Sequence, residues 1–509
     1  MIATEKALRR QAALIARASE TRLFIVLAAA AAAIVAGISV TRDHPTALSA
    51  LVLLSLFAGL TALFGIIQGV VLLFSLALPA YEVGWFDLFH GSIGLFTLMV
   101  LTVVAVVVAA APQEWLPILR RRATWPVIAF AASVAFSLAV APRTDLSTHL
   151  AKTYLGRALV LPLSLAVAVA ALSRADAFRL LARIRVGVVL VALAGSILAI
   201  LQIGTGRGYL VPSNTTIYIE QFLGIRAIGL SEAPGTWGAF LLLPIALLVS
   251  VLVRRPSLLG AGVLLMLFVG LAFSGLRSAW LAGGVVIIGL PLLAPGAWWR
   301  RLTPIALTVC SVLIVLQFTN FRAFLNGAGS NEVHSSTTTS RGQQDPSLGR
   351  GRLGADESLR FRYNITRAEL ELGRRHPVAG VGLGNLGLAL KELPASYRGA
   401  QKGLVPGVPI EKHNTYAGLF AELGSLGALT FLALIAGGFI ALARLRRIVQ
   451  GTPLEVELVD GLIGAFAATS IVAGFTEADR QVFLWWVLGL AIGLAAATQR
   501  RNPARASAR

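Results

Sequence analysis

Apolar runs of about 20 residues recur along this chain, and they constrain its fold more than any other feature. A run of that length crosses the hydrocarbon core of a bilayer as one α-helix. Hydrophobic residues make up 56% of the chain and charged residues 13%, whereas ordinary globular domains carry about 25% charged residues. We therefore predict an all-α fold, a polytopic membrane bundle of about 12–14 transmembrane helices.

Two of the apolar runs are too long for one span. The run at 257–294 is interrupted at 274–278, which predicts a helical hairpin with its tip there. The run at 47–80 would reach about 50 Å as one helix, more than the roughly 30 Å of the hydrocarbon core. We expect it to cross twice or to re-enter, with a turn near Gly65; one long tilted span is the alternative.

The net charge of +20 does not indicate a nucleic-acid partner. The basic residues stand in short clusters between apolar runs, at 120–122, 254–255 and 444–447 for example. Such clusters are typical of cytoplasmic loops, whereas a nucleic-acid-binding protein gathers them on one soluble face. The only cysteine, Cys310, lies within an apolar run, so neither an internal disulfide nor a cysteine metal site is possible.

This charge pattern predicts two cytoplasmic termini and one large external loop. The expected segments are a cytoplasmic basic N-terminus (1–21), N-terminal transmembrane helices (22–318), the external loop with short helices (319–412), C-terminal transmembrane helices (413–498) and a cytoplasmic basic tail (499–509). A loop of this length is more than a connection. Helical spacing from Ser358 to Arg375, followed by Pro377, predicts one helix within it.

The first candidate functional residue is His413, at the junction of the external loop and the next span. A neutral imidazole where a helix enters the bilayer can accept a proton at physiological pH. The alternative is an interfacial polar residue that caps the helix together with Asn414 and Thr415.

Two arginines fall on the same outer face in this topology. Arg277 stands at the tip of the predicted hairpin, and Arg226 precedes the helix that begins near Pro234. The alternatives are a snorkelling side chain for Arg277 and an ordinary loop charge for Arg226. Two guanidinium forks beside a base would suit a substrate that bears a diphosphate.

The external loop also contains glycines at 380, 382 and 384 and several acidic residues. A glycine-rich loop can present N–H groups to an anion, but without a preceding strand we interpret this run as a turn. The acidic residues lack metal-ligand spacing, so we interpret them as solvated; they are Asp356, Glu357, Glu369 and Glu371.

Four stretches, in this order, resemble the O-antigen ligase and O-antigen polymerase family of bacterial membrane glycosyltransferases. They are 226–229 followed by 234–240; 273–281; 362–370 followed by 376–385; and 413–416 followed by 421–427. The last two stretches are the most specific. Arg277 falls on the family's hairpin arginine, although Leu276 and Ser278 replace the small residues that usually flank it.

The resemblance implies a GT-C-like, multi-pass protein of the bacterial plasma (inner) membrane with its active site facing outside. Such an enzyme transfers a glycan from a polyprenyl diphosphate, such as undecaprenyl diphosphate, to a hydroxyl of an acceptor glycan or glycolipid. It inverts the anomeric centre and needs neither metal nor cofactor. By this resemblance His413 is the general base, Arg226 and Arg277 bind the diphosphate, and Arg362 is a further diphosphate-binding candidate.

Several functions remain open within this prediction. A ligase would move a finished polymer onto a lipid-linked acceptor, whereas an O-antigen or exopolysaccharide polymerase would join repeat units. We favour the ligase. A transporter of lipid-linked glycans could use the same basic groups, but transporters usually show midplane charges and repeated halves. A non-catalytic assembly protein is the remaining alternative, and in it His413 would be replaceable.

Overall fold

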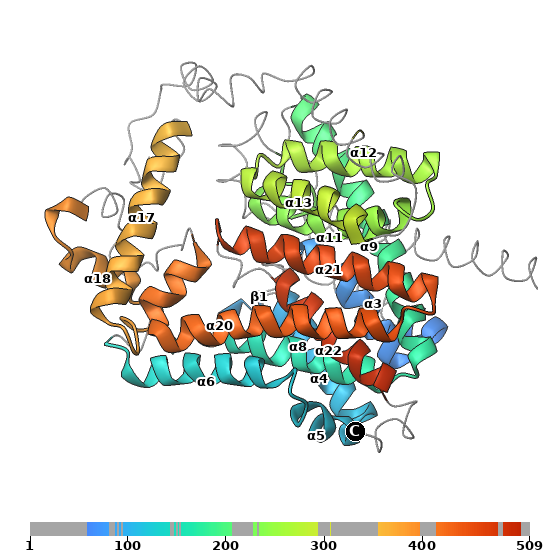
Figure 1. The fold of residues 1–509 in the computed structure, drawn as a ribbon, viewed down its shortest axis with the longest axis horizontal. Helices are drawn as coiled ribbons and strands as arrows, with labels where there is room; N and C mark the ends of the chain where they lie inside the picture. Colours follow the sequence, from blue (N-terminus) through green and yellow to red (C-terminus); the bar gives the residue numbers. More distant parts are fainter. Residues whose placement is uncertain are drawn as a thin grey trace, which may run out of the picture.

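The computed structural model describes residues 59–80, 87–88, 91–92, 95–142, 147–148, 151, 154–205, 227–231, 234–293, 306, 355–397, 414–476 and 482–499. This part of the chain is a bundle of helices (Figure 1) with one antiparallel pair of two-residue strands, β1 (Asp87–Leu88) and β2 (Gly91–Ser92). The predicted all-α, polytopic membrane fold is confirmed.

The helices, numbered as in Figure 1, have the following bounds. They are α3 (Ile66–Leu76), α4 (Leu95–Ala110), α5 (Trp115–Leu119), α6 (Trp125–Val140), α8 (Leu161–Ala170), α9 (Arg174–Thr205), α11 (Pro234–Leu252), α12 (Leu258–Phe273), α13 (Arg277–Leu293), α17 (Ala355–Arg375), α18 (Leu386–Glu392), α20 (Thr415–Ile448), α21 (Pro453–Ala473) and α22 (Val482–Gln499). A π-helix, η3 (Gly156–Val160), leads into α8. The structure also contains three 3-10 turns among the described residues, η1 (Leu78–Ala80), η2 (Pro112–Glu114) and η6 (Ala395–Tyr397).

Five of the described helices are long and apolar enough to cross a membrane, namely α9, α11, α20, α21 and α22. Shorter apolar helices, including α3, α6, α12 and α13, pack beside them. Apart from residue 306, the spans expected before residue 59 and at 302–318 lie outside the described residues.

The turn predicted near Gly65 is present. Gly65 has a φ of 84° between two helical segments, a conformation that favours glycine. A Cβ added to Gly69 would lie 2.7 Å from the backbone nitrogen of Thr61, although eight residues of straight helix span about 12 Å. The chain therefore folds back at Gly65 instead of continuing as one long tilted helix.

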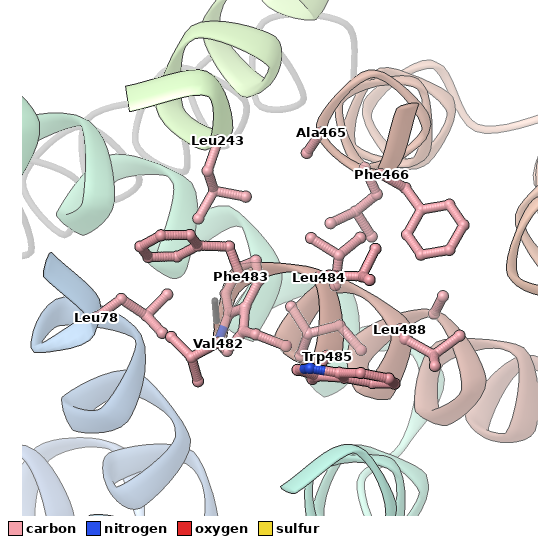
Figure 2. Close-up of a cluster of buried hydrophobic side chains, with 14 of the residues drawn as sticks. Leu78, Leu243, Ala465, Phe466, Val482, Phe483, Leu484, Trp485 and Leu488 are labelled. Atoms are coloured by element: carbon pink, nitrogen blue, oxygen red, sulfur yellow. The ribbon is translucent and has the colours of Figure 1, made fainter. Parts of the chain in front are cut away.

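The core is built around α22. Figure 2 shows side chains of α22, among them Phe483, Trp485 and Leu488, gathered with Leu243 of α11 and Phe466 of α21. All five are buried.

A close helix contact lies on another side of α22, where Gly489 and Gly493 face α8. A Cβ on Gly489 would lie 2.8 Å from the Pro162 carbonyl oxygen, and one on Gly493 would lie 2.7 Å from Val169 Cβ. Glycines four residues apart let two membrane helices approach this closely.

Helices at the periphery expose apolar stripes at helical spacing. On α13 the exposed residues include Leu281, Val285, Ile288 and Leu292. On α6 they include Trp125, Ile128, Phe136 and Val140. Contiguous apolar surface of this kind is unfavourable in water and suits lipid.

The basic clusters meet at one end of the bundle, around the first turns of α21. Glu455 pairs with Arg174, Glu457 pairs with Arg185, and Asp460 pairs with both Arg254 and Arg446. Arg121 Nη1 donates to Gln499 Oε1 at the end of α22, 2.5 Å away. We call this the arginine end. The described members of the clusters predicted to share one membrane face thus lie at one end, and the cytoplasmic location of that face remains a prediction.

Candidate functional site

The hairpin predicted at 274–278 is present, with Arg277 at its tip. Helix α12 ends at Phe273 and α13 begins at Arg277, and Gly275 between them has a φ of 64°. The Arg277 side chain is exposed, whereas its neighbours Leu276 and Ser278 are buried. The larger residues that flank this arginine therefore point into the bundle.

Arg226 lies outside the described residues, but the chain that follows it is placed against this hairpin. The Ala227 amide donates to the carbonyl of Phe273, 2.8 Å away. Gly229 has a φ of 55°, and a Cβ there would lie 2.3 Å from the indole of Trp237. Only glycine suits this position.

The helix predicted in the external loop is present as α17. Ile365 and Leu372 belong to a cluster of buried residues on its inner side, and Gly373 packs against Phe420 of α20. Figure 1 shows that α17 runs across the end of the bundle, not along it. Arg362 Nη1 reaches from this helix to the carbonyl oxygen of Phe475, 3.2 Å away.

The start of α20 is capped by Asn414, which the sequence analysis named only within the alternative interpretation of His413. Asn414 Oδ1 accepts hydrogen bonds from the amides of Tyr416 and Ala417 at 3.0 and 3.1 Å. His413, the preceding residue, lies outside the described residues. Thr415 Oγ1 donates to the carbonyl of Thr476, 2.7 Å away.

Helix α20, which the sequence analysis expected to enter the bilayer just after His413, is interrupted near its start. Gly424 interrupts it with φ 65° and ψ −163°. The rings of Tyr416 and Phe431 lie 5.6 Å apart, although fifteen residues of straight helix would separate them by about 22 Å. The first segment, 415–423, is therefore a short helix that folds back along the spanning part.

The glycine-rich stretch is a turn, as predicted, and it docks on this break. The amides of Val381 and Gly382 donate to the carbonyls of Ala421 and Glu422 at 2.8 and 3.0 Å. The Gly384 amide donates to Glu422 Oε1 at 3.0 Å. These N–H groups are therefore already hydrogen-bonded within the protein and do not form an anion cradle.

Two buried carboxylates in this region were not identified from the sequence. Glu369 is fully buried on the inner side of α17, so its interpretation as a solvated residue is wrong. Its spacing, four residues after Ile365 and three before Leu372, placed it on the apolar face. Glu422 is 1% exposed and holds the turn. Glu371 is partly exposed and pairs with Arg375. Within the described residues, no group of three or more His, Cys, Asp or Glu side chains could hold a metal ion.

The orientation of α13 against α21 shows at which end of the bundle Arg277 lies. Leu293 accepts a hydrogen bond from Arg446, which also pairs with Asp460. One turn earlier in α13, Leu290 packs against Gly464, which lies one turn later in α21 than Asp460. Helices α13 and α21 are thus antiparallel.

Arg277 consequently lies at the same end of the bundle as Phe475 and Thr476, opposite the arginine end. We call this the site end. It contains the hairpin tip, the Arg362 side of α17 and the capped start of α20.

No curated protein matches this sequence. Residues 261–432 match the family model described as O-antigen ligase. The matched region runs from α12 to the spanning part of α20 and contains Arg277, Arg362 and His413; Arg226 precedes it. The match indicates a membrane glycosyltransferase-type activity that acts on lipid-linked glycans and acceptors. Over residues 261–432, about a third of its length, the chain is therefore similar to the O-antigen ligase family.

Proposed function

We propose that the protein transfers a glycan from a polyprenyl diphosphate carrier to a sugar hydroxyl of an acceptor glycan or glycolipid. One observation carries the proposal. Within the family region, Arg362 and the helix that begins just after His413 are attached to the C-terminal end of α21, and the hairpin tip with Arg277 lies at the same end of the bundle.

His413 is the general base in this proposal. It removes the proton of the acceptor hydroxyl as that oxygen attacks C1 of the donor sugar. The new C1–O bond forms while the bond from C1 to the diphosphate oxygen breaks, and the diphosphate leaves with the electron pair. Direct attack inverts the anomeric centre. General base catalysis of this kind contributes about 10²–10⁴-fold in rate.

The arginines hold the leaving group. Arg226 and Arg277 bind the diphosphate and stabilise the charge that develops on it. Arg362 is the third candidate. A guanidinium has five N–H donors, so Arg362 can donate to the Phe475 carbonyl and to a phosphate oxygen together. Because the leaving group is already a diphosphate, the proposed step uses no metal ion and no cofactor.

The proposed orientation places the arginine end in the cytoplasm and the site end outside the plasma membrane. The excess of short basic loops at one end supports it. The segment boundaries at 21, 318, 412 and 498 belong to the same proposal, with 319–412 outside. Donor and acceptor would then meet at the outer surface of the inner membrane.

Ligation is the favoured form of this reaction, because the matched family carries that description. Polymerisation of repeat units is the alternative within the same chemistry. Transport of a lipid-linked glycan is the alternative from another class, and it predicts movement of the glycan without a new glycosidic bond.

Complementation of a deletion strain tests the proposal. Wild type, His413→Ala and His334→Ala would be expressed at equal membrane levels, and the surface glycan and polyprenyl-linked pool would be compared. His334 is a matched control because it lies in the Ser/Thr-rich part of the loop, outside the resembling stretches. We expect loss of the surface glycan only with His413→Ala.

The accumulated lipid-linked pool then separates the two reactions. Long chains left on the carrier indicate a ligase, and single repeats indicate a polymerase. A His413→Ala protein that restores the glycan as well as wild type would overturn the general-base assignment and favour transport or assembly.

A further inference from the structure

We infer that Gln202 is a positioning residue that holds the segment after Arg226 against the hairpin turn of Arg277. The inference rests on the proposed function. Gln202 lies near the end of α9, in an apolar stretch between Val186 and Ile203 where the only other polar residue is Ser196.

The Gln202 side chain is 2% exposed and is hydrogen-bonded to the backbone of a non-helical segment. Its Oε1 accepts from the amides of Ile228 and Gly229, each at 3.1 Å. Its Nε2 donates to the carbonyl of Gly229 at 3.2 Å. One side-chain amide therefore satisfies two adjacent N–H groups and one carbonyl.

The same segment is held from two further directions. Ala227 donates to Phe273, the last residue of α12. Trp237 packs under Gly229, and its ring also fills the space beside Gly195 of α9, where a Cβ would lie 2.2 Å from it. Together, Gln202, Trp237 and Phe273 hold residues 227–229 beside the turn that carries Arg277.

A glutamine is suited to this position for a chemical reason. The segment 227–230 is not helical, so its peptide groups cannot all pair locally, and lipid offers no partners for them. An amide both accepts and donates, whereas an apolar side chain of similar size does neither. Shifting a binding group by about 1 Å can reduce a rate by about 10²-fold, so loss of this contact should affect the diphosphate-bearing donor.

Kinetics with a purified protein and a polyprenyl-diphosphate-linked glycan as probe test the inference. We expect Gln202→Met to lower kcat/KM for the donor by at least about tenfold and to leave KM for the acceptor unchanged. In its neutral form Gln202→Glu keeps an acceptor for Ile228 and Gly229 and a donor for the Gly229 carbonyl, so it should recover part of the activity. Gln202→Asn has a side chain one methylene shorter, which cannot reach the segment, so it should not recover the activity.

Two controls separate positioning from general stability. Gln68→Met makes the same change at the arginine end, where Gln68 Oε1 accepts from Arg183, and should leave donor kinetics unchanged. In an Arg277→Ala background, Gln202→Met should add little further loss, because residues that act through one another are not additive.

Hydrogen exchange measures the contact independently of activity. The Ile228 and Gly229 amides should exchange faster in Gln202→Met than in wild type, with other regions unchanged. Wild-type donor kinetics in Gln202→Met, or a full additive loss in the Arg277→Ala background, would overturn the inference. A wild-type protein without transferase activity would instead overturn the proposed function and the catalytic part of this inference, and exchange would still show whether Gln202 holds the segment.

Discussion

Arg362 of α17 donates to the carbonyl oxygen of Phe475 at the end of α21, 3.2 Å away. The next carbonyl along the chain, that of Thr476, accepts a hydrogen bond from the hydroxyl of Thr415. A helix of the long loop and the helix that begins after His413 are therefore attached to adjacent peptide groups. The loop is thus part of the candidate site.

The attachment of Arg362 predicts a specific loss when its guanidinium is removed. Arg362→Ala should reduce kcat/KM for the lipid-linked donor by about 10²-fold, as removal of one charged transition-state donor does. Arg362→Lys should recover little, because an ammonium lacks the planar fork. Arg360→Ala, two residues earlier and exposed, is the control. Equal donor kinetics for the 360 and 362 variants would remove Arg362 from the site.

The break in α20 depends on the backbone of Gly424. Gly424→Ala adds a Cβ at positive φ, 2.3 Å from the Val378 carbonyl oxygen. We expect a cost of at least about 1–3 kcal/mol, seen as a lower melting temperature in detergent. Gly289→Ala in α13 is the control, because its Cβ would meet no atom within 4 Å. That change should be neutral or slightly stabilising. Equal melting temperatures for the two variants would argue against the folded-back segment.

The arginine end relies on Asp460, which is 1% exposed between Arg254 and Arg446 at 2.5 and 2.6 Å. Asp460→Asn leaves two partly buried guanidinium groups without their shared charge, and breaking a buried pair costs about 3–5 kcal/mol. Thermal unfolding should show a marked loss of stability. Asp176→Asn breaks the exposed pair with Arg179 and should change the thermal stability little.

Glu422 joins the glycine turn to α20 through one side-chain oxygen. Glu422→Gln keeps an acceptor for the Gly384 amide and should remain folded. Glu422→Ala leaves that amide unpaired, which costs about 1–3 kcal/mol. Limited proteolysis of the 376–385 turn measures the difference. Equal protection in both variants would show that the backbone contacts alone hold the turn.

Local patterns in the sequence were sufficient for the helices and for several of their ends. An apolar run in lipid can satisfy its peptide groups only as a helix, which determined the polytopic bundle. The break at 274–278 and the helical spacing before Pro377 are short-range features, and both were predicted from neighbouring residues. The cap at Asn414 is equally local, but the sequence offered it only as the alternative interpretation of His413. The resemblance likewise indicated His413, Arg226, Arg277 and Arg362 from short stretches.

Only the tertiary structure decided how these elements meet. In the sequence, Gly424 is one more small residue in an apolar run, and its positive φ is explained only by contact with Val378, 46 residues away. Glu369 is buried because α17 docks on α20, and Gln202 acquires its function from a loop 26 residues later. Hydrophobic periodicity decides whether a segment is a helix. Its partners depend on packing between residues far apart in the chain, which no local pattern encodes.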